Sequence, residues 1–252
     1  MAGRLGMPAP LELSIIVPAY NEEARLPRTL QRIGDYLRRA HPPSEIVVVD
    51  DGSTDRTPEV VRTMQKEMPE LHLLLNGENR GKGCSVRTGM LAARGAIALF
   101  TDADLSAPIE EAEKLLDALA SADVAIGSRA LDRRLIQVHQ SPARELAGIF
   151  FNRMVRLATG LPFEDTQCGF KAFRTDRTRI VFEQQRIEDF GFDPEILFLA
   201  QRHGLRIVEI PVRWAHDPRT KVHMLHDSLR MFAGLWQIRW SAMLGRYPHR
   251  GK

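Results

Sequence analysis

The chain has 252 residues, of which 44% are hydrophobic and 27% charged, an ordinary globular composition with enough apolar residues for one substantial core. Its net charge of +3 and pI of about 9.1 suit anionic partners such as nucleotide sugars, lipid phosphates or a membrane surface. It lacks zinc-finger spacing, a basic region with heptads and a ribonucleoprotein pattern, so we expect no nucleic-acid binding.

Cysteine content and the first residues bear on the compartment. Cys84 and Cys168 make no disulfide framework and suit a reducing environment. Residues 1–10 contain no long apolar run, so we expect neither a secretory signal nor an N-terminal anchor, and we expect this segment to be disordered. These features predict a cytoplasmic protein.

The first half of the chain alternates strand and helix patterns. Apolar, β-branched runs predict buried strands over residues 13–18, 45–50, 71–75, 96–101 and 123–127. Helices are expected from about Pro27, from Pro58, after Gly83 and over residues 108–120. This alternation predicts an α/β fold with a mostly parallel central sheet flanked by helices, whose ligands gather at the carboxyl ends of the strands.

Two carboxylates end the apolar run at residues 96–101. In an extended segment Asp102 and Asp104 would point to the same side and converge on one point. Oxygen ligands of this kind favour a hard divalent cation, Mg²⁺ or Mn²⁺. Alternatively, the two residues begin a loop and cap the next helix, with Pro108 at its first position. An aspartyl phosphatase also has Asp-x-Asp after a strand, normally the first strand, whereas three strands precede Asp102.

Polar residues also follow the other strands. Gly81-Lys82-Gly83 opens a helix, and this pattern is compatible with an anion nest that faces a diphosphate. Turn geometry alone explains the glycines and Ser53 equally well. The first turn lacks G-x-G-x-x-G and no G-x-x-x-x-G-K-[ST] occurs, which excludes dinucleotide dehydrogenases and P-loop proteins.

An ordered set of motifs resembles a known family. Residues 15–22 (IIVPAYNE), 48–55 (VVDDGSTD), 79–83 (NRGKG) and 102–104 (DAD) resemble the family 2 glycosyltransferases of the GT-A fold. Residues 126–129 (IGSR) and 165–171 (DTQCGFK) resemble its dolichyl-phosphate β-glucosyltransferase branch, which is related to the polyprenyl-phosphate mannose synthases. The resemblance runs from about Leu13 to about Trp240. It implies one GT-A domain over residues 11–222, followed by a C-terminal amphipathic helix and basic tail over residues 223–252.

The resemblance also implies roles for single residues. Asp104 would bind the metal directly, and Asp102 would hold the ribose or the outer metal shell. Arg129 would face the acceptor phosphate, with Arg133, Arg134 and Arg144 as helpers. Asp165 would orient the acceptor or, for a hydroxyl acceptor, take its proton; a structural carboxylate bonded to backbone amides is the alternative. The nucleotide-sugar site would comprise Pro18, Tyr20, Asn21, Glu22, Asp51, Ser53, Lys82, Asp102 and Lys221, with Asp51 as partner of the nucleobase.

The implied reaction is an inverting, metal-dependent transfer of a hexose from a nucleotide sugar to a polyprenyl or dolichyl phosphate. UDP-glucose is the expected donor, because residues 165–171 match the glucosyl branch. GDP-mannose as donor, a soluble hydroxyl acceptor and a non-catalytic nucleotide-sugar-binding protein remain alternatives at this point.

The tail carries apolar residues at helical spacing. Arg230, Arg239 and Arg246 interrupt this region, and its apolar runs are too short for a helix that spans a membrane. The apolar stripe either packs on the catalytic domain or lies in a membrane interface, where a lipid phosphate is presented. We expect peripheral attachment at the cytoplasmic face of a membrane. The stripe consists of Leu225, Leu229, Phe232, Trp236 and Trp240.

Overall fold

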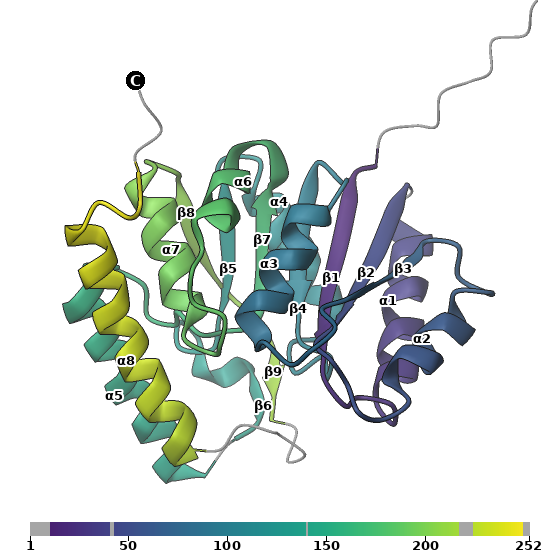
Figure 1. Cartoon of the computed structure of the whole chain (residues 1–252), viewed down its shortest axis with the longest axis horizontal. Coiled ribbons are helices and arrows are strands. Elements are labelled where there is room, and N and C mark those ends of the chain that lie inside the picture. The colour runs from purple at the N-terminus through teal and green to yellow at the C-terminus, as the bar shows by residue number, and fades with distance from the viewer. Residues whose placement is uncertain (1–10, 41–42, 140, 217–223, 249–252) are drawn as a thin grey trace, which may run out of the picture.

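A computed structural model describes residues 11–40, 43–139, 141–216 and 224–248 (Figure 1). Its centre is a seven-stranded sheet in the order β3-β2-β1-β4-β7-β5-β8, with β7 antiparallel to both β4 and β5 and the other pairings parallel. The strands are β1 (Leu13–Ala19), β2 (Ser44–Asp50), β3 (Leu71–Leu75), β4 (Ile97–Thr101), β5 (Val124–Ser128), β7 (Phe170–Arg174) and β8 (Ile207–Pro211). A separate parallel pair comprises β6 (Ile136–Val138) and β9 (Trp214–Ala215).

Helices cover both faces of the sheet (Figure 1). The described helices are α1 (Leu26–Ala40), α2 (Thr57–Met64), α3 (Lys82–Ala92), η1 (Ile109–Glu111), α4 (Ala112–Ala118), η2 (Arg133–Leu135), α5 (Pro142–Thr159), α6 (Thr175–Gln184), α7 (Phe192–Arg202) and α8 (Met224–Met243). The predicted fold class is therefore confirmed, and the five predicted strands match β1 to β5 to within one residue at either end. The antiparallel strand β7 was not predicted.

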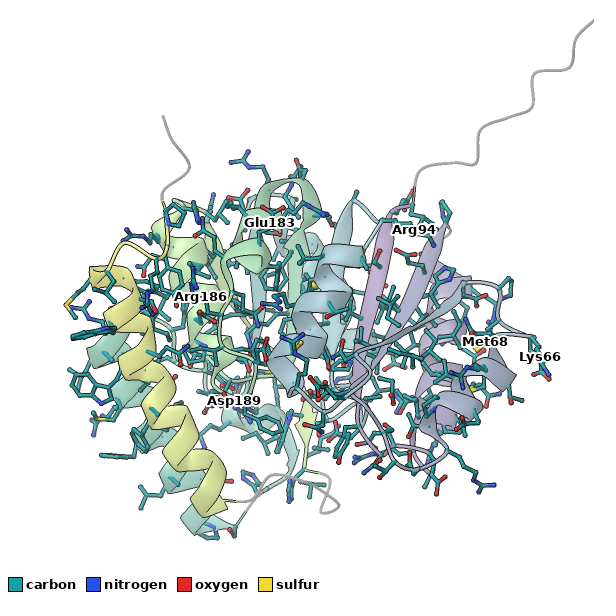
Figure 2. All side chains as sticks on the ribbon, in the orientation of Figure 1. Lys66, Met68, Arg94, Glu183, Arg186 and Asp189 are labelled. Carbon is teal, nitrogen blue, oxygen red and sulfur yellow. The ribbon has the colours of Figure 1, made fainter. Side chains whose placement is uncertain are left out.

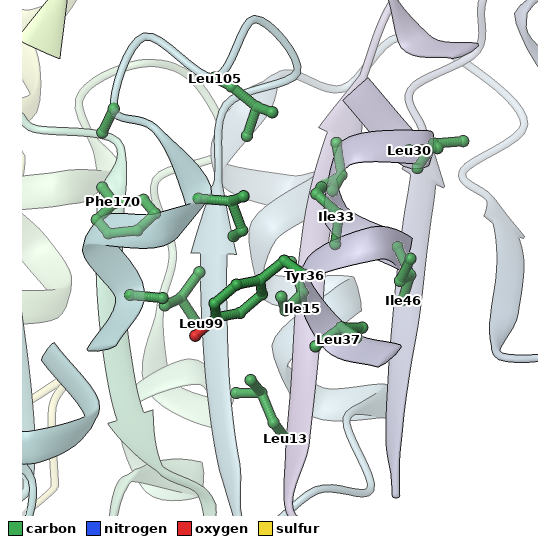
Figure 3. Close-up of a cluster of buried hydrophobic side chains, with 14 of the residues drawn as sticks. Leu13, Ile15, Leu30, Ile33, Tyr36, Leu37, Ile46, Leu99, Leu105 and Phe170 are labelled. Atoms are coloured by element: carbon green, nitrogen blue, oxygen red, sulfur yellow. The ribbon is translucent and has the colours of Figure 1, made fainter. Parts of the chain in front are cut away.

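The sheet separates two apolar cores, because neighbouring residues of a strand point to opposite faces. On one face, Leu30, Ile33 and Leu37 of α1 lie against Ile15 and neighbouring strands (Figure 3). On the other face, Ile16 belongs to the core built with α3, α6 and α7. The Phe100 and Phe173 rings, on adjacent strands, stack there at 6.0 Å between centroids.

The C-terminal helix α8 lies beside α5 (Figure 1). Leu235 and Ile238 form its buried face, while Trp236 and Trp240 are 77% and 60% exposed. Phe232 packs edge-on against Phe151 of α5, at 5.2 Å between ring centroids. The predicted apolar stripe is thus divided between two faces of the helix, and the side chains of Leu225 and Leu229 lie outside the described residues.

After α8, the chain returns to the core. Tyr247 is fully buried, and its hydroxyl donates to the Glu195 carboxylate of α7 at 2.6 Å. Within the described part of the chain, no helix combines the length and the apolar character needed to cross a membrane.

Candidate active site

The candidate active site lies at the carboxyl edge of the parallel strands. Asp51 follows β2, Asp102 follows β4 and Arg129 follows β5. Because β7 runs antiparallel to β4 and β5, it begins at the edge where they end. The segment before β7, which contains Asp165 and Gly169, therefore joins the same edge.

The turns after β1 and β2 are joined by hydrogen bonds. Ser53 Oγ accepts the Asn21 N–H at 2.8 Å, and Asn21 Oδ1 accepts the Thr54 N–H at 2.7 Å. The Glu22 N–H donates to Thr57 Oγ1 at 2.7 Å, and the Glu22 carboxylate pairs with Arg25 at 2.6 Å. Polar groups of Asn21, Glu22 and Ser53, which are predicted to contact a nucleotide, thus also form the hydrogen bonds that hold the two turns together.

Among the predicted nucleotide-binding residues, Pro18 and Tyr20 lie at the same edge. Pro18 is the sixth residue of β1 and pairs in register with Val49, whereas Tyr20 follows the strand and is 37% exposed. Lys221 lies outside the described residues, and so does the side chain of Arg144. Their predicted roles stay predictions.

Asp51 organises the loop after β3. Its buried carboxylate accepts the Gly81 N–H at 2.7 Å, the Arg80 N–H at 3.2 Å and the Asn76 side-chain amide at 2.8 Å. Gly52, with φ +70°, lets this loop approach, since an added Cβ would lie 2.5 Å from the Glu78 backbone. The predicted contact of Asp51 with a nucleobase stays a prediction.

The amides at the start of α3 are partly used by the protein itself. The Cys84 N–H donates to the Glu188 carbonyl at 3.0 Å, and the Gly81 N–H donates to Asp51. The loop that carries Glu188 joins α6 to α7, and Figure 2 labels its Arg186 and Asp189. At this helix start, the side chain of Lys82 is therefore better suited than a nest of amides to meet an anion.

Lys82 and Asp102 form an ion pair with Nζ and Oδ1 2.5 Å apart. The Lys82 ammonium also lies 6.0 Å from the centroid of the Phe192 ring. Burial by itself would lower the pKa of Lys82, but the negative charges of Asp102 and Asp193 outweigh it and raise that pKa. Lys82 therefore stays a cation at the point where a diphosphate is predicted to bind.

The chemistry of Asp102 and Asp104 fits a divalent cation. Burial, and then the charge of Asp102, raise the pKa of Asp104, whose Oδ1 accepts the Ser106 N–H at 2.8 Å. A raised pKa means that negative charge at Asp104 is incompletely compensated. Within the described residues no cluster of three or more His, Cys, Asp and Glu side chains could hold a metal. A cation bound by these two carboxylates would take further oxygens from water or substrate, as Mg²⁺ commonly does.

Arg129 and Asp165 form a two-pronged ion pair, with N to O distances of 2.7 and 2.8 Å. The Arg129 N–H donates to the same carboxylate at 3.0 Å, and the guanidinium lies 5.4 Å from the Trp214 ring centroid. Burial alone would raise the pKa of Asp165, but Arg129 outweighs it and lowers that pKa to about 2. A carboxylate held in this way is poorly suited to accept a proton near neutral pH, which favours the orienting role.

The two other arginines predicted to help at the acceptor pair locally. Arg133 forms an ion pair with Glu145 of α5, and Arg134 pairs with Asp132 at 2.9 Å. Both pairs lie within residues 132–145.

Sequence reasoning gave no role to three residues beneath this edge. Lys171 of β7 is fully buried and forms an ion pair with Asp193 of α7. At Gly169 an added Cβ would lie 2.2 Å from Asp102 Oδ2, so the Asp102 carboxylate rests directly on this glycine. A lysine within an apolar strand pattern was the available signal, because a buried lysine requires a buried anion.

Comparisons with known proteins find glycosyltransferases that are similar to this chain. The family described as "Glycosyl transferase family 2" matches residues 14–178. A dolichyl-phosphate beta-glucosyltransferase of Drosophila melanogaster is 38% identical, covering 90% of this chain and 74% of its own. The dolichyl-phosphate beta-glucosyltransferase ALG5A of Trichomonas vaginalis is 35% identical, with 92% and 77% covered.

A solved structure shares the fold. The glucosyl-3-phosphoglycerate synthase of Mycobacterium tuberculosis, in complex with Mn²⁺, UDP-glucose and phosphoglyceric acid, superposes with a TM-score of 0.62 at 17% identity. The match covers 91% of this chain and 80% of that one.

The contact between Gly169 and Asp102 predicts a local defect in Gly169→Ala. Because the new Cβ would lie 2.2 Å from the Asp102 carboxylate, Asp102 must move, and we expect Mn²⁺ affinity to fall by roughly 10-fold or more. Electron paramagnetic resonance titration of Mn²⁺ measures this. Gly148→Ala in α5, where nothing lies within 4 Å of the added Cβ, is the control and should bind Mn²⁺ normally. Equal affinity in both variants would contradict the assignment of Asp102.

The Arg129–Asp165 pair predicts a pH-dependent contribution to stability. The folded-state pKa of Asp165 is lowered from 3.8 to about 2, so the stabilisation is fully present above pH 4 and is lost as the pH falls toward 2. This shift corresponds to about 2 kcal/mol, and Asp165→Asn should lose at least that much unfolding free energy at pH 7.

Urea unfolding at pH 7, 5, 4 and 3 tests this prediction, and the difference from wild type should narrow at the lowest pH. Asp132→Asn is the matched control, since its partner Arg134 is 90% exposed and such surface pairs contribute little. If the difference in unfolding free energy between wild type and Asp165→Asn stays constant from pH 7 to pH 3, the ionisation of Asp165 does not contribute to stability as predicted.

Proposed function

This chain belongs to glycosyl transferase family 2, and on that premise we propose that it transfers glucose from UDP-glucose to a dolichyl or related polyprenyl phosphate. Relatives named as dolichyl-phosphate beta-glucosyltransferases are 35% and 38% identical to it over 90% or more of its length. The carboxylates and cations gathered at the carboxyl edge of the sheet support the same reaction class.

The observation that carries the choice of acceptor is the Arg129–Asp165 ion pair. An inverting transfer to a hydroxyl group needs a proton acceptor, and Asp165, with its pKa lowered to about 2, is poorly suited to that task. A lipid monophosphate is already anionic at pH 7, because its second pKa is about 6. It needs positioning rather than a base, and the geometry therefore favours a phosphate acceptor.

Each charged group has a part in this reaction. The planar guanidinium of Arg129, 30% exposed, suits the oxygens of the acceptor phosphate. An oxygen of that phosphate attacks the anomeric carbon on the face opposite the diphosphate. The new carbon–oxygen bond forms as the bond to the diphosphate breaks, the electron pair leaves with UDP, and the product is β-linked.

The diphosphate side is served by Lys82 and the two aspartates. A divalent cation held by Asp102 and Asp104 would stabilise the charge that develops on the departing diphosphate. We infer that Mn²⁺ or Mg²⁺ serves here, and the synthase of Mycobacterium tuberculosis that shares the fold was crystallised with Mn²⁺ and UDP-glucose. Lys82 would add a second positive charge next to Asp102.

We further propose that the protein attaches peripherally to the cytoplasmic face of a membrane through α8, together with α5. Trp236 and Trp240 of α8 are 77% and 60% exposed, and Phe150 and Leu157 of α5 are 56% and 80% exposed. Helices with such aromatic and aliphatic residues beside arginines suit the interface of an anionic bilayer. A polyprenyl phosphate presents its headgroup at such an interface.

A panel of donors and acceptors tests the proposed function. With Mn²⁺ or Mg²⁺, we expect UDP-glucose and a short polyprenyl phosphate to give UDP release and labelled glucose in the organic phase, and Asp104→Asn to lose at least about 100-fold of this rate. GDP-mannose and 3-phosphoglycerate are the parallel arms. Faster turnover with GDP-mannose would show that the proposed donor is wrong. Turnover with phosphoglycerate in the absence of lipid would show that the proposed acceptor is wrong.

The exposed tryptophans predict a defect in membrane binding. Trp236→Ser/Trp240→Ser should reduce flotation with vesicles that contain anionic lipid by about 10-fold or more, because the variant lacks the two indole side chains that would be buried in the membrane interface. Turnover of a short, detergent-dispersed polyprenyl phosphate should be retained. Leu75→Ser, which removes an exposed apolar side chain (53%) from the far edge strand β3, is the control. Undiminished flotation of the tryptophan variant would exclude α8 from the attachment surface.

A further inference from the structure

A buried ion pair lies beneath the candidate active site. Lys171 belongs to β7, between β4 and β5, and its ammonium pairs with the Asp193 carboxylate in the first turn of α7. The side chains are 0% and 6% exposed. Replacing such a pair with apolar residues of similar volume is often neutral or stabilising. Stability alone therefore explains this pair poorly, and its contacts point toward the site.

The lysine end of the pair supports Asp102. Lys171 Nζ donates to the Cys168 carbonyl at 2.6 Å, which ties down the turn before β7. The next residue, Gly169, lies so close that a Cβ there would be 2.2 Å from Asp102 Oδ2. The buried ammonium thus fixes the backbone against which the Asp102 carboxylate rests.

The aspartate end of the pair supports Lys82. Asp193 adjoins Phe192, whose ring centroid lies 6.0 Å from the Lys82 ammonium. A Cβ added to Gly83 would lie 2.7 Å from Phe192 Cβ, so the starts of α3 and α7 are in close contact. The negative charge of Asp193 acts on Lys82 as well as on Lys171.

We propose that the Lys171–Asp193 pair is a positioning device that holds both members of the Lys82–Asp102 contact in place for a nucleoside diphosphate with its divalent cation. The inference rests on the proposed function and deepens it, because it assigns two further residues to donor binding. One end sets the carboxylate through the turn at residues 168–169, and the other attracts the ammonium across the contact of α3 with α7. Neither residue needs to touch the substrate.

The double variant Lys171→Met/Asp193→Leu tests the proposal. It removes both charges and puts apolar side chains with about the same number of non-hydrogen atoms in their place, so we expect it to fold with a thermal midpoint near that of wild type. Its dissociation constant for UDP with Mn²⁺, measured by calorimetry, should rise by about 10-fold or more. In steady-state assays the donor KM should rise more than kcat falls, since the defect lies in donor binding.

Two further variants complete the design. Asp193→Asn keeps the shape and removes only the charge, so it should also weaken UDP–Mn²⁺ binding even if the double variant fails to fold. Glu45→Gln/Arg94→Met removes a different ion pair, between the buried carboxylate of Glu45 near the start of β2 and the 59% exposed Arg94, at the opposite edge of the sheet. This control should bind UDP–Mn²⁺ as wild type does.

The outcomes separate the two proposals. If wild type binds UDP–Mn²⁺ and a folded double variant or Asp193→Asn binds it equally well, the pair is only structural and the inference is wrong. If wild-type protein binds neither UDP nor GDP with Mn²⁺, the proposed function itself is overturned, and the positioning role with it.

Discussion

A carboxylate removed from water must receive hydrogen bonds or a cation, and this requirement shapes the edge of the sheet where the strands β1, β2, β4 and β5 end. Asp51 meets it with the amides of the loop after β3. Asp165 meets it with Arg129, and Asp193 with Lys171. Each of these interactions joins a different segment of the chain to the carboxyl edge of the sheet. Asp104 stands apart, because it forms no ion pair with any of the described residues, and burial together with the charge of Asp102 raises its pKa. The carboxylates that are neutralised within the protein thus form a frame around Asp104, whose charge is not neutralised in this way.

The position of β7 explains why this frame unites distant parts of the chain. A strand inserted antiparallel between β4 and β5 begins where they end. The turn before it therefore lies beside Asp102, although Gly169 comes 67 residues later in the sequence. The same strand carries Lys171 into the middle of the sheet, where its partner comes from α7. A wholly parallel sheet would have placed this turn at the opposite edge.

The sequence predicted the alternating half of the fold well, because apolar runs and helix-opening prolines report local structure directly. The strand expected over residues 71–75 coincides with β3. The order of strands depends on long-range pairing that no local pattern encodes, so the insertion of β7 was missed. At the site, residue type predicts a divalent cation at Asp102 and Asp104, which stays a prediction, but it did not indicate the internal hydrogen bonds of Asn21 and Ser53. A sequence does not distinguish a polar side chain that hydrogen-bonds within the protein from one that contacts a ligand.

The Tyr247–Glu195 hydrogen bond makes part of the site's support depend on a residue near the end of the chain. Glu195 also accepts the backbone N–H groups of Arg186 and Ile187, in the loop whose Glu188 carbonyl receives the Cys84 N–H of α3. The phenol that completes this arrangement is 52 residues further along the chain than Glu195. During synthesis the N-terminal strands emerge first, so the sheet can assemble while Glu195 still lacks its partner. The hydrogen bond from Tyr247 to Glu195, which supports the loop against the start of α3, can therefore form only after residue 247 has left the ribosome.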